Sequence, residues 1–155
     1  MRGVVASVAM AWAIGAMPVA HADPYEAEPD LAKRDVDYAA AKEAIQRRDW
    51  PEAVRRLQRT AVREPDSADL QNLLGYSYRN LGQLEPAFKH YKQALVLDPR
   101  HRGAHEYIGE TYLMAGDITA AERHLAALRE ICLLPCEEMG DLERAIASYR
   151  AKGLR

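Results

Sequence analysis

The chain has two cysteines, Cys132 and Cys136, which are separated by three residues that include Pro135. Three kinds of chemistry suit this spacing. A disulfide can form, because such a spacer across a turn brings two Cα atoms within the roughly 4.4 to 6.8 Å that the bond needs. A thiol-redox pair is the second interpretation. A Cu(I) site is the third, because Cu(I) prefers soft thiolate ligands and either Met139 or Met114 adds a thioether.

The histidines are the other side chains that can carry chemistry, and they form no recognisable catalytic pattern. None of His90, His101, His105 and His124 stands beside a plausible nucleophile. His101 and His105 have the i, i+4 spacing of a helical metal site, but no third ligand is near them in sequence. We therefore expect no enzymatic activity, no cofactor and no metal, with the cysteine pair as the exception considered above.

The N-terminal residues indicate where the protein resides. Residues 1–22 have the layout of a secretory signal peptide: Arg2, an uncharged stretch over 4–17, and the small-residue triplet that ends at Ala22. A helix over 4–17 spans only about 21 Å, which is short of a bilayer core of about 30 Å, so we expect cleavage after Ala22 rather than a membrane anchor. Residues 23–34 are acidic and twice interrupted by proline, which predicts a mobile tail.

This leader predicts a periplasmic or secreted bacterial protein that has no membrane attachment after cleavage. An oxidising compartment favours the disulfide between Cys132 and Cys136. The whole chain of 155 residues has a formal net charge of -2, with 48% apolar and 28% charged residues. This balance is that of an ordinary globular protein, and its lack of positive charge argues against nucleic acid as a partner.

Behind the leader, the sequence repeats with a period of 34 residues. Ala53, Ala87 and Ala121 stand at this spacing. Other positions follow the same offset: Trp50, Leu84 and Ile118; Leu74 and Ile108; Gly75 and Gly109; Tyr78 and Tyr112; Gly82 and Gly116; Pro65 and Pro99. Self-similarity at such a period is typical of solenoids, in which each unit stacks on the next.

Each unit contains two helix-period patterns that are joined by a short turn. The expected helices cover 35–47, 51–63, 68–81, 85–97, 102–115 and 118–132. We expect Gly75 to face Ala87 and Gly109 to face Ala121, so that antiparallel helices can approach closely. His90 and His124 occupy equivalent positions in successive units, which indicates an exposed row on the second helices.

The C-terminal segment predicts one further helix over 135–152, which is the remnant of a truncated fourth unit. Leu142, Ile146 and Tyr149 have the spacing of its buried stripe. Cys132 then ends the last helix of the third unit, and Cys136 lies in the first turn of this capping helix. A disulfide in so small a loop would serve mainly to fix the angle of the cap.

The stretch LLGYSYRNLGQLEPAFKHYKQALVLDP, residues 73–99, is similar to a tetratricopeptide repeat almost position for position. The chain resembles three such repeats, over 34–67, 68–101 and 102–133. The resemblance implies an all-α solenoid of helix-turn-helix repeats with a C-terminal capping helix. One departure recurs, because Asp37, Gln71 and His105 stand where the family usually has an aromatic residue.

The resemblance also implies a binding surface, since the first helices of such repeats line a concave face that receives a segment of a partner protein. Tyr76 offers a rigid aromatic surface, and Lys42 and Arg79 can meet a carboxylate. The amides of Asn72 and Asn80 can bond a partner backbone. The positions that match this face are Tyr38, Lys42, Ile45, Asn72, Tyr76, Arg79, Asn80, Glu106, Glu110 and Leu113.

We therefore expect a non-enzymatic scaffold or adaptor of the bacterial envelope that binds another protein or peptide on its concave face. Cys132 and Cys136 would fix the cap. The alternative is a thiol-redox or copper-handling assembly factor, in which the repeats dock a client and the cysteine pair acts on it.

Overall fold

The computed structural model describes residue 31 and residues 35–153. The expected signal peptide, and the expected acidic tail apart from Leu31, lie outside these residues. Seven α-helices with both ends described follow one another along the chain. They are α2 (Val36–Gln46), α3 (Trp50–Arg63), α4 (Ala68–Asn80), α5 (Leu84–Leu97), α6 (Arg102–Met114), α7 (Ile118–Ile131) and α8 (Glu137–Gly153). None of these helices combines the length and the apolar character needed to cross a membrane.

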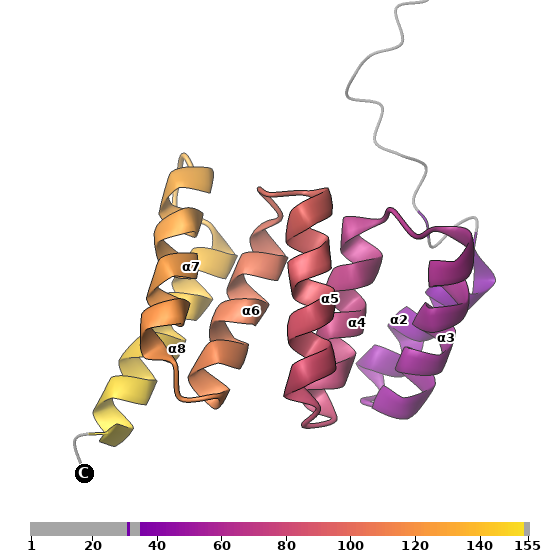
Figure 1. Ribbon diagram of the computed structural model, residues 1–155, viewed down its shortest axis with the longest axis horizontal. Helices are drawn as coiled ribbons and strands as arrows, with labels where there is room; N and C mark the ends of the chain where they lie inside the picture. The colour runs from indigo at the N-terminus through magenta and orange to yellow at the C-terminus, as the bar shows by residue number, and fades with distance from the viewer. Residues whose placement is uncertain (1–30, 32–34, 154–155) are drawn as a thin grey trace, which may run out of the picture.

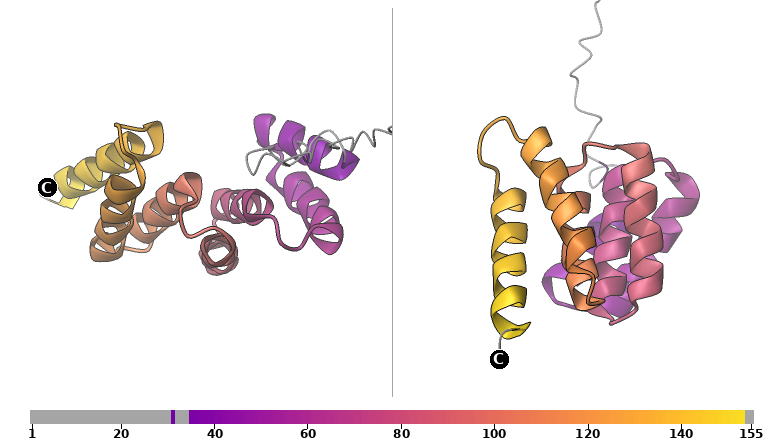
Figure 2. Two further views of the ribbon diagram at one scale, coloured as in Figure 1. Left: turned by 90° about the horizontal axis from the view of Figure 1, so that it is seen from above. Right: turned by 60° about the vertical axis from the view of Figure 1, so that its left-hand side comes forward.

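The helices form pairs that stack along the long axis of the molecule (Figure 1). The units are α2 with α3, α4 with α5, and α6 with α7, and α8 follows alone. Because α4 packs on α6 and α6 packs on α8, the first helices share one layer, and the second helices α3, α5 and α7 lie beside them. The views in Figure 2 show the same succession of pairs from two other directions. The predicted all-α solenoid is confirmed.

The turn between the two helices of a unit uses the left-handed region of the backbone. Gly82 has φ of 74° and Gly116 has φ of 84°, values that glycine adopts without the steric penalty of a Cβ atom. Arg48 holds the equivalent place in the first unit, with φ of 59°. The helices then begin at capping side chains, such as Asp117, which accepts a hydrogen bond from the amide of Ala120 at 2.9 Å.

The hydrophobic core runs through the stack as three clusters, each shared between neighbouring helices. In the first cluster Leu57 of α3 meets Leu70 and Leu74 of α4. The last cluster includes Leu142 and Ile146 of α8, with Tyr149 packed against it. The predicted buried stripe of the capping helix is therefore present, and α8 occupies the place of a first helix in a fourth unit.

Two of the helical glycines, Gly75 and Gly109, lie beneath large side chains. A Cβ atom on Gly75 would lie 2.6 Å from Cδ1 of Tyr91, and one on Gly109 would lie 2.7 Å from Cδ2 of Leu142. The nearest neighbours are therefore Tyr91 and Leu142, and not the alanines that the repeat pattern suggested. The missing side chain makes room for a bulky residue of the facing helix.

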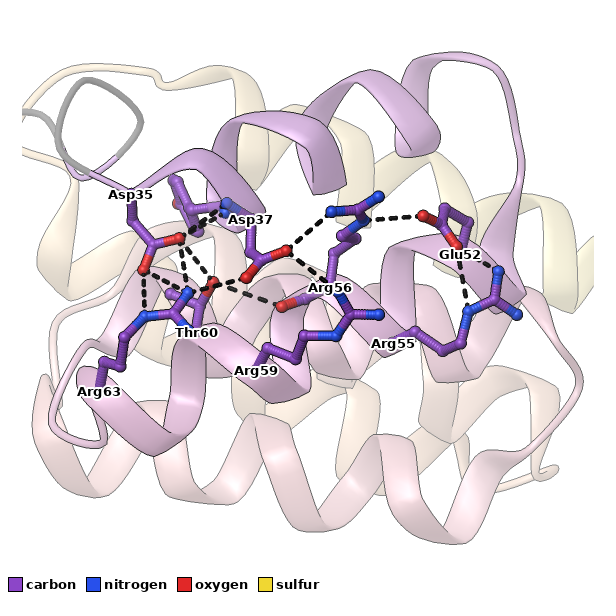
Figure 3. Close-up of polar contacts among 9 residues, drawn as sticks. Asp35, Asp37, Glu52, Arg55, Arg56, Arg59, Thr60 and Arg63 are labelled. Atoms are coloured by element: carbon purple, nitrogen blue, oxygen red, sulfur yellow. Dashed lines mark hydrogen bonds and ion pairs between the residues drawn. The ribbon is translucent and has the colours of Figure 1, made fainter.

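A polar network joins α2 to α3 in the first unit (Figure 3). Asp35 caps α2 by accepting hydrogen bonds from the amides of Asp37 and Tyr38, at 2.9 and 3.0 Å. Arg63 reaches across from α3 and donates to both carboxylates, to Asp35 at 2.9 Å and to Asp37 at 3.0 Å. Arg56 also donates to Asp37, at 2.9 Å. The two helices are thus tied together by charge-assisted hydrogen bonds.

The contact between Asp37 and Arg56 recurs in every unit with other polar residues. In the second unit Oε1 of Gln71 lies 2.8 Å from Nδ1 of His90. In the third unit Nδ1 of His105 lies 2.9 Å from Nδ1 of His124. His90 and His124 are half-buried partners of first-helix residues, so the expectation of an exposed histidine row is wrong. The first-helix members of these pairs, Asp37, Gln71 and His105, are the residues that depart from the aromatic position of the repeat pattern.

Candidate functional site on the first-helix face

We use the term first-helix face for the surface on which α4, α6 and α8 present Tyr76, Tyr107, Arg79, Glu106, Glu110 and the pocket described below. Its centre is an aromatic stack. The ring of Tyr76 lies 5.7 Å from that of Trp50 in an edge-to-face arrangement, and 5.0 Å from that of Tyr107. Such contacts hold the rings in place, so the face has a rigid floor.

Arg79 lies over this stack and is already engaged. Its guanidinium carbon is 5.2 Å from the ring centroids of both Tyr76 and Tyr107, within cation–π range. The same guanidinium forms an ion pair with Glu110 of α6. The side chain of Arg79 is only 13% exposed. Its charge is therefore committed within the protein, contrary to the expectation that Arg79 receives a carboxylate of a partner.

Glu106 lies one turn before Glu110 on α6 and has no such compensation. It is 7% exposed, and it makes no hydrogen bond or ion pair with the residues that the structure describes. Burial raises the pKa of Glu106 to about 7, and the nearby carboxylates of Glu110, Glu138 and Glu137 act in the same direction, whereas Arg79 opposes them. A positive charge placed beside Glu106 would therefore stabilise the ionised form of its carboxyl group.

A pocket of about 400 Å³ opens at the α8 end of the face. Its walls combine apolar side chains of α6 and α8 with the ion pair of Arg79 and Glu110. Met114 is 57% exposed at this pocket. The lining residues are Arg79, Glu110, Leu113, Met114, Ala145, Ser148, Tyr149 and Lys152. An apolar pocket beside a few polar groups is typical of a site that receives a side chain.

The structure places the other predicted contact residues differently. Tyr38 is 6% exposed and packs among Ala41, Leu57, Leu70 and Leu74, so it belongs to the core and not to an open surface. The reason is that Tyr38 turns toward the facing helices of its own and the next unit.

Four further predicted contact positions divide between the interior and the surface. Asn72 is buried, and a Cβ atom added to Gly103 would lie 3.3 Å from its Nδ2 atom. The Oδ1 atom of Asn72 has no hydrogen-bond partner among the described residues. Ile45 packs against the first core cluster. Lys42 and Asn80 are exposed, as a contact role requires.

Sequence reasoning missed several residues of the face. Tyr107 and Tyr149 were not assigned to it, and Met114 was considered only as a copper ligand. Trp50 was identified only as a repeat position. Two sequence features could have pointed to them: Tyr107 follows Glu106 in the chain, and Tyr149 belongs to the predicted buried stripe of the capping helix. Neither pattern shows which of these rings meet across helices.

The cysteine pair lies at the joint between α7 and α8. Cys132 and Cys136 form a disulfide with a Cα separation of 6.0 Å. Cys132 follows α7, and Cys136 precedes α8, which begins at Glu137 rather than at residue 135 as expected. Met139 packs among the apolar side chains of the last core cluster. Among the described residues no group of three or more His, Cys, Asp and Glu side chains is placed to hold a metal ion.

Solved structures share this fold across most of the chain. The type III secretion translocator chaperone SycD of Yersinia enterocolitica superposes with a TM-score of 0.70 at 19% identity, covering 83% of this chain and 90% of that one. The tetratricopeptide repeat domain of Sgt2 from Aspergillus fumigatus gives 0.69 at 16% identity, covering 83% of this chain and 82% of that one. PcrH, in complex with the chaperone-binding region of PopD, gives 0.66 at 21% identity, covering 82% and 96%.

The sequence comparisons agree with the fold. Curated proteins gave no match. The family model described as tetratricopeptide repeat matches residues 38–99 and again residues 79–132. These overlapping matches cover more than half of the chain and the helices α2 to α7 almost completely. The chain therefore belongs to the tetratricopeptide repeat family.

Proposed function

We propose that the protein is a non-enzymatic scaffold or adaptor that binds a segment of another protein on its first-helix face. The observation that carries this proposal is the pocket of about 400 Å³, which the exposed Met114 lines together with Arg79, the side chain that lies over the rings of Tyr76 and Tyr107. A preformed apolar pocket next to ordered aromatic rings suits a protein anchor side chain.

Two structural neighbours support a protein segment as the ligand. PcrH was crystallised with the chaperone-binding region of PopD, and SycD was crystallised with a peptide of the translocator YopD. We extend this mode of binding to the present chain by analogy of fold.

We further propose that the protein acts in the bacterial envelope, in the periplasm or outside the cell. The support is the signal-peptide layout of residues 1–22. N-terminal sequencing of the protein recovered from the periplasmic fraction of a producing bacterium tests this. The expected first residue is Asp23, and recovery of uncleaved protein from the cytoplasm contradicts the proposal.

Site-specific photo-crosslinking tests the binding surface in the native cell. A photoreactive phenylalanine analogue is placed at Met114 on the first-helix face, and in a matched variant at Val96 of α5, another exposed apolar residue. We expect a discrete crosslinked species from position 114 and none from position 96. Crosslinking at position 96 alone, or at neither position, contradicts the proposed surface.

The alternative of thiol-redox or copper chemistry rests on the surroundings of the disulfide. A pocket of about 600 Å³ adjoins Cys132 and Cys136, and Arg100 and Arg102 line it. Guanidinium groups near a thiolate favour its ionised form. Titration of the anaerobically reduced protein with Cu(I) tests the copper version, with the double variant C132S/C136S as control. Equal uptake by both proteins removes that candidate.

A further inference from the structure

The first-helix face has an uneven charge distribution, and Glu106 lies at its acidic end. Glu106 is nine-tenths buried without a hydrogen bond or ion pair among the described residues. The charged groups that face it are Glu110 on α6, Glu137 and Glu138 on α8, and Arg79 on α4. Negative groups therefore outnumber positive ones around Glu106.

Neither nearby arginine neutralises Glu106. Arg79 forms its ion pair with Glu110, and Arg102 lies 3.7 Å from a carboxylate oxygen of Glu138. The described residues also lack a cluster of three or more metal-binding side chains, so an organic cation suits the position better than a metal ion. A lysine or arginine side chain supplies that charge together with hydrogen-bond donors.

The apolar pocket and Glu106 are separated along the axis of α6. Glu106 and Met114 belong to the same helix, and their separation of eight positions corresponds to about 12 Å along its axis. An extended chain rises about 3.3 Å per residue, so an interval of three or four residues spans the two features.

We propose that the first-helix face recognises an extended protein segment in which a lysine or arginine stands three or four residues from a large apolar residue. The basic group pairs with Glu106, and the apolar side chain enters the pocket beside Met114. This inference rests on the proposed function and names the chemistry of the partner segment.

Selection from a display library of random twelve-residue peptides tests the inference without a known partner. The library is panned separately on the wild-type protein, on E106Q and on E130Q. Glu130 is an exposed residue of the second helix α7, and its substitution makes the same chemical change on another face. We expect wild type and E130Q to enrich the basic residue at the stated interval from an apolar one. E106Q should enrich the apolar residue alone.

One selected peptide then serves as a fluorescent probe in anisotropy titrations. We expect the substitution E106Q to weaken binding of this peptide at least tenfold. Replacement of the peptide's lysine by norleucine should weaken binding to the wild-type protein by the same factor, but should hardly change binding to E106Q. Because the pKa of Glu106 is about 7, binding to wild type should strengthen by about tenfold from about pH 6 to about pH 8 as the carboxyl ionises. E106Q should not show this change.

The outcomes separate the inference from the proposed function. Enrichment of the same basic peptides by E106Q with unchanged affinity overturns the inference. Selection of peptides without a basic residue also overturns the inference. If M114E abolishes the binding of those peptides, the proposed binding surface is nevertheless supported. Peptide binding that M114E leaves intact, or the absence of any enriched peptide, counts against the proposed function and the inference together.

Discussion

Leu142 of the capping helix lies directly over Gly109 of α6, with its Cδ2 atom 2.7 Å from the position of a Cβ on that glycine. Leu142 is fully buried and belongs to the same cluster as Leu125 and Leu128 of α7. The capping helix is therefore seated by close packing, and the glycine is what allows the two helices to approach.

The variant G109A should destabilise the protein by about 1–3 kcal/mol, because the added methyl group overpacks a closed contact. Urea unfolding followed by circular dichroism measures this. G140A is the matched control within α8. A Cβ there would meet only the flexible end of Arg144, at 3.3 Å, so the usual helix preference for alanine should make G140A neutral or stabilising. Equal effects of the two substitutions contradict the packing described for Gly109.

The variant R48G should stabilise the first unit by about 1 kcal/mol. Arg48 has φ of 59° at the turn position where the later units have Gly82 and Gly116, and a non-glycine residue is strained there. The midpoint of urea unfolding reports the change. R47G is the control, because Arg47 has φ of -81° and glycine relieves no strain at that position. A stabilising R47G, or a destabilising R48G, contradicts the expectation.

Acid should destabilise the third unit through His124. Burial lowers the pKa of His124 to about 4, and the neighbouring His105 and Arg123 act in the same direction. The neutral imidazole thus contributes stability that is fully present above its ordinary pKa of 6.5 and is lost as the pH falls toward about 4. His105 has its Nε2 atom 3.1 Å from the carbonyl oxygen of Pro99, so Nε2 donates and Nδ1 accepts from His124.

Thermal unfolding between about pH 7 and about pH 4.5 measures this dependence. H124Q should lose less thermal stability than wild type over that interval, because glutamine does not take up a proton. H90Q should show a change in the same direction, since burial and the nearby Lys89 also lower the pKa of His90. An unaltered pH dependence in H124Q contradicts the role assigned to His124.

Loss of the disulfide should cost about 2 kcal/mol, because the bond closes a very short loop. The variant C132S/C136S should keep its helix content, since Leu142 and Ile146 hold α8 in the core without the bond. Urea unfolding and circular dichroism measure the two quantities. Intact mass of the protein isolated from the cell that naturally produces it reports the oxidation state, and the detection of two free thiols rules out a structural disulfide.

The sequence by itself determined the succession of helices and the capping helix. The helix-period patterns of the three units predicted the bounds of α2 to α7 to within one residue, and the pattern of the C-terminal segment predicted those of α8 to within two. Helix periodicity, glycine turns and small residues are local signals, so they can be identified along the chain without knowledge of the packing. The buried stripe of Leu142 and Ile146 followed from spacing in the same way.

Only the tertiary structure decided which polar side chains are paired with a partner inside the protein. Arg79 was predicted to meet a partner, but it pairs with Glu110 of the next repeat, and the ring of Tyr76, another predicted contact, packs against that of Tyr107. The recurring contacts that begin with Asp37 and Arg56 likewise join separate helices. These contacts depend on how side chains of stacked helices interdigitate, which periodicity does not encode. For the same reason only the packed structure identifies Glu106 as a buried carboxyl group that has no ion-pair partner among the described residues.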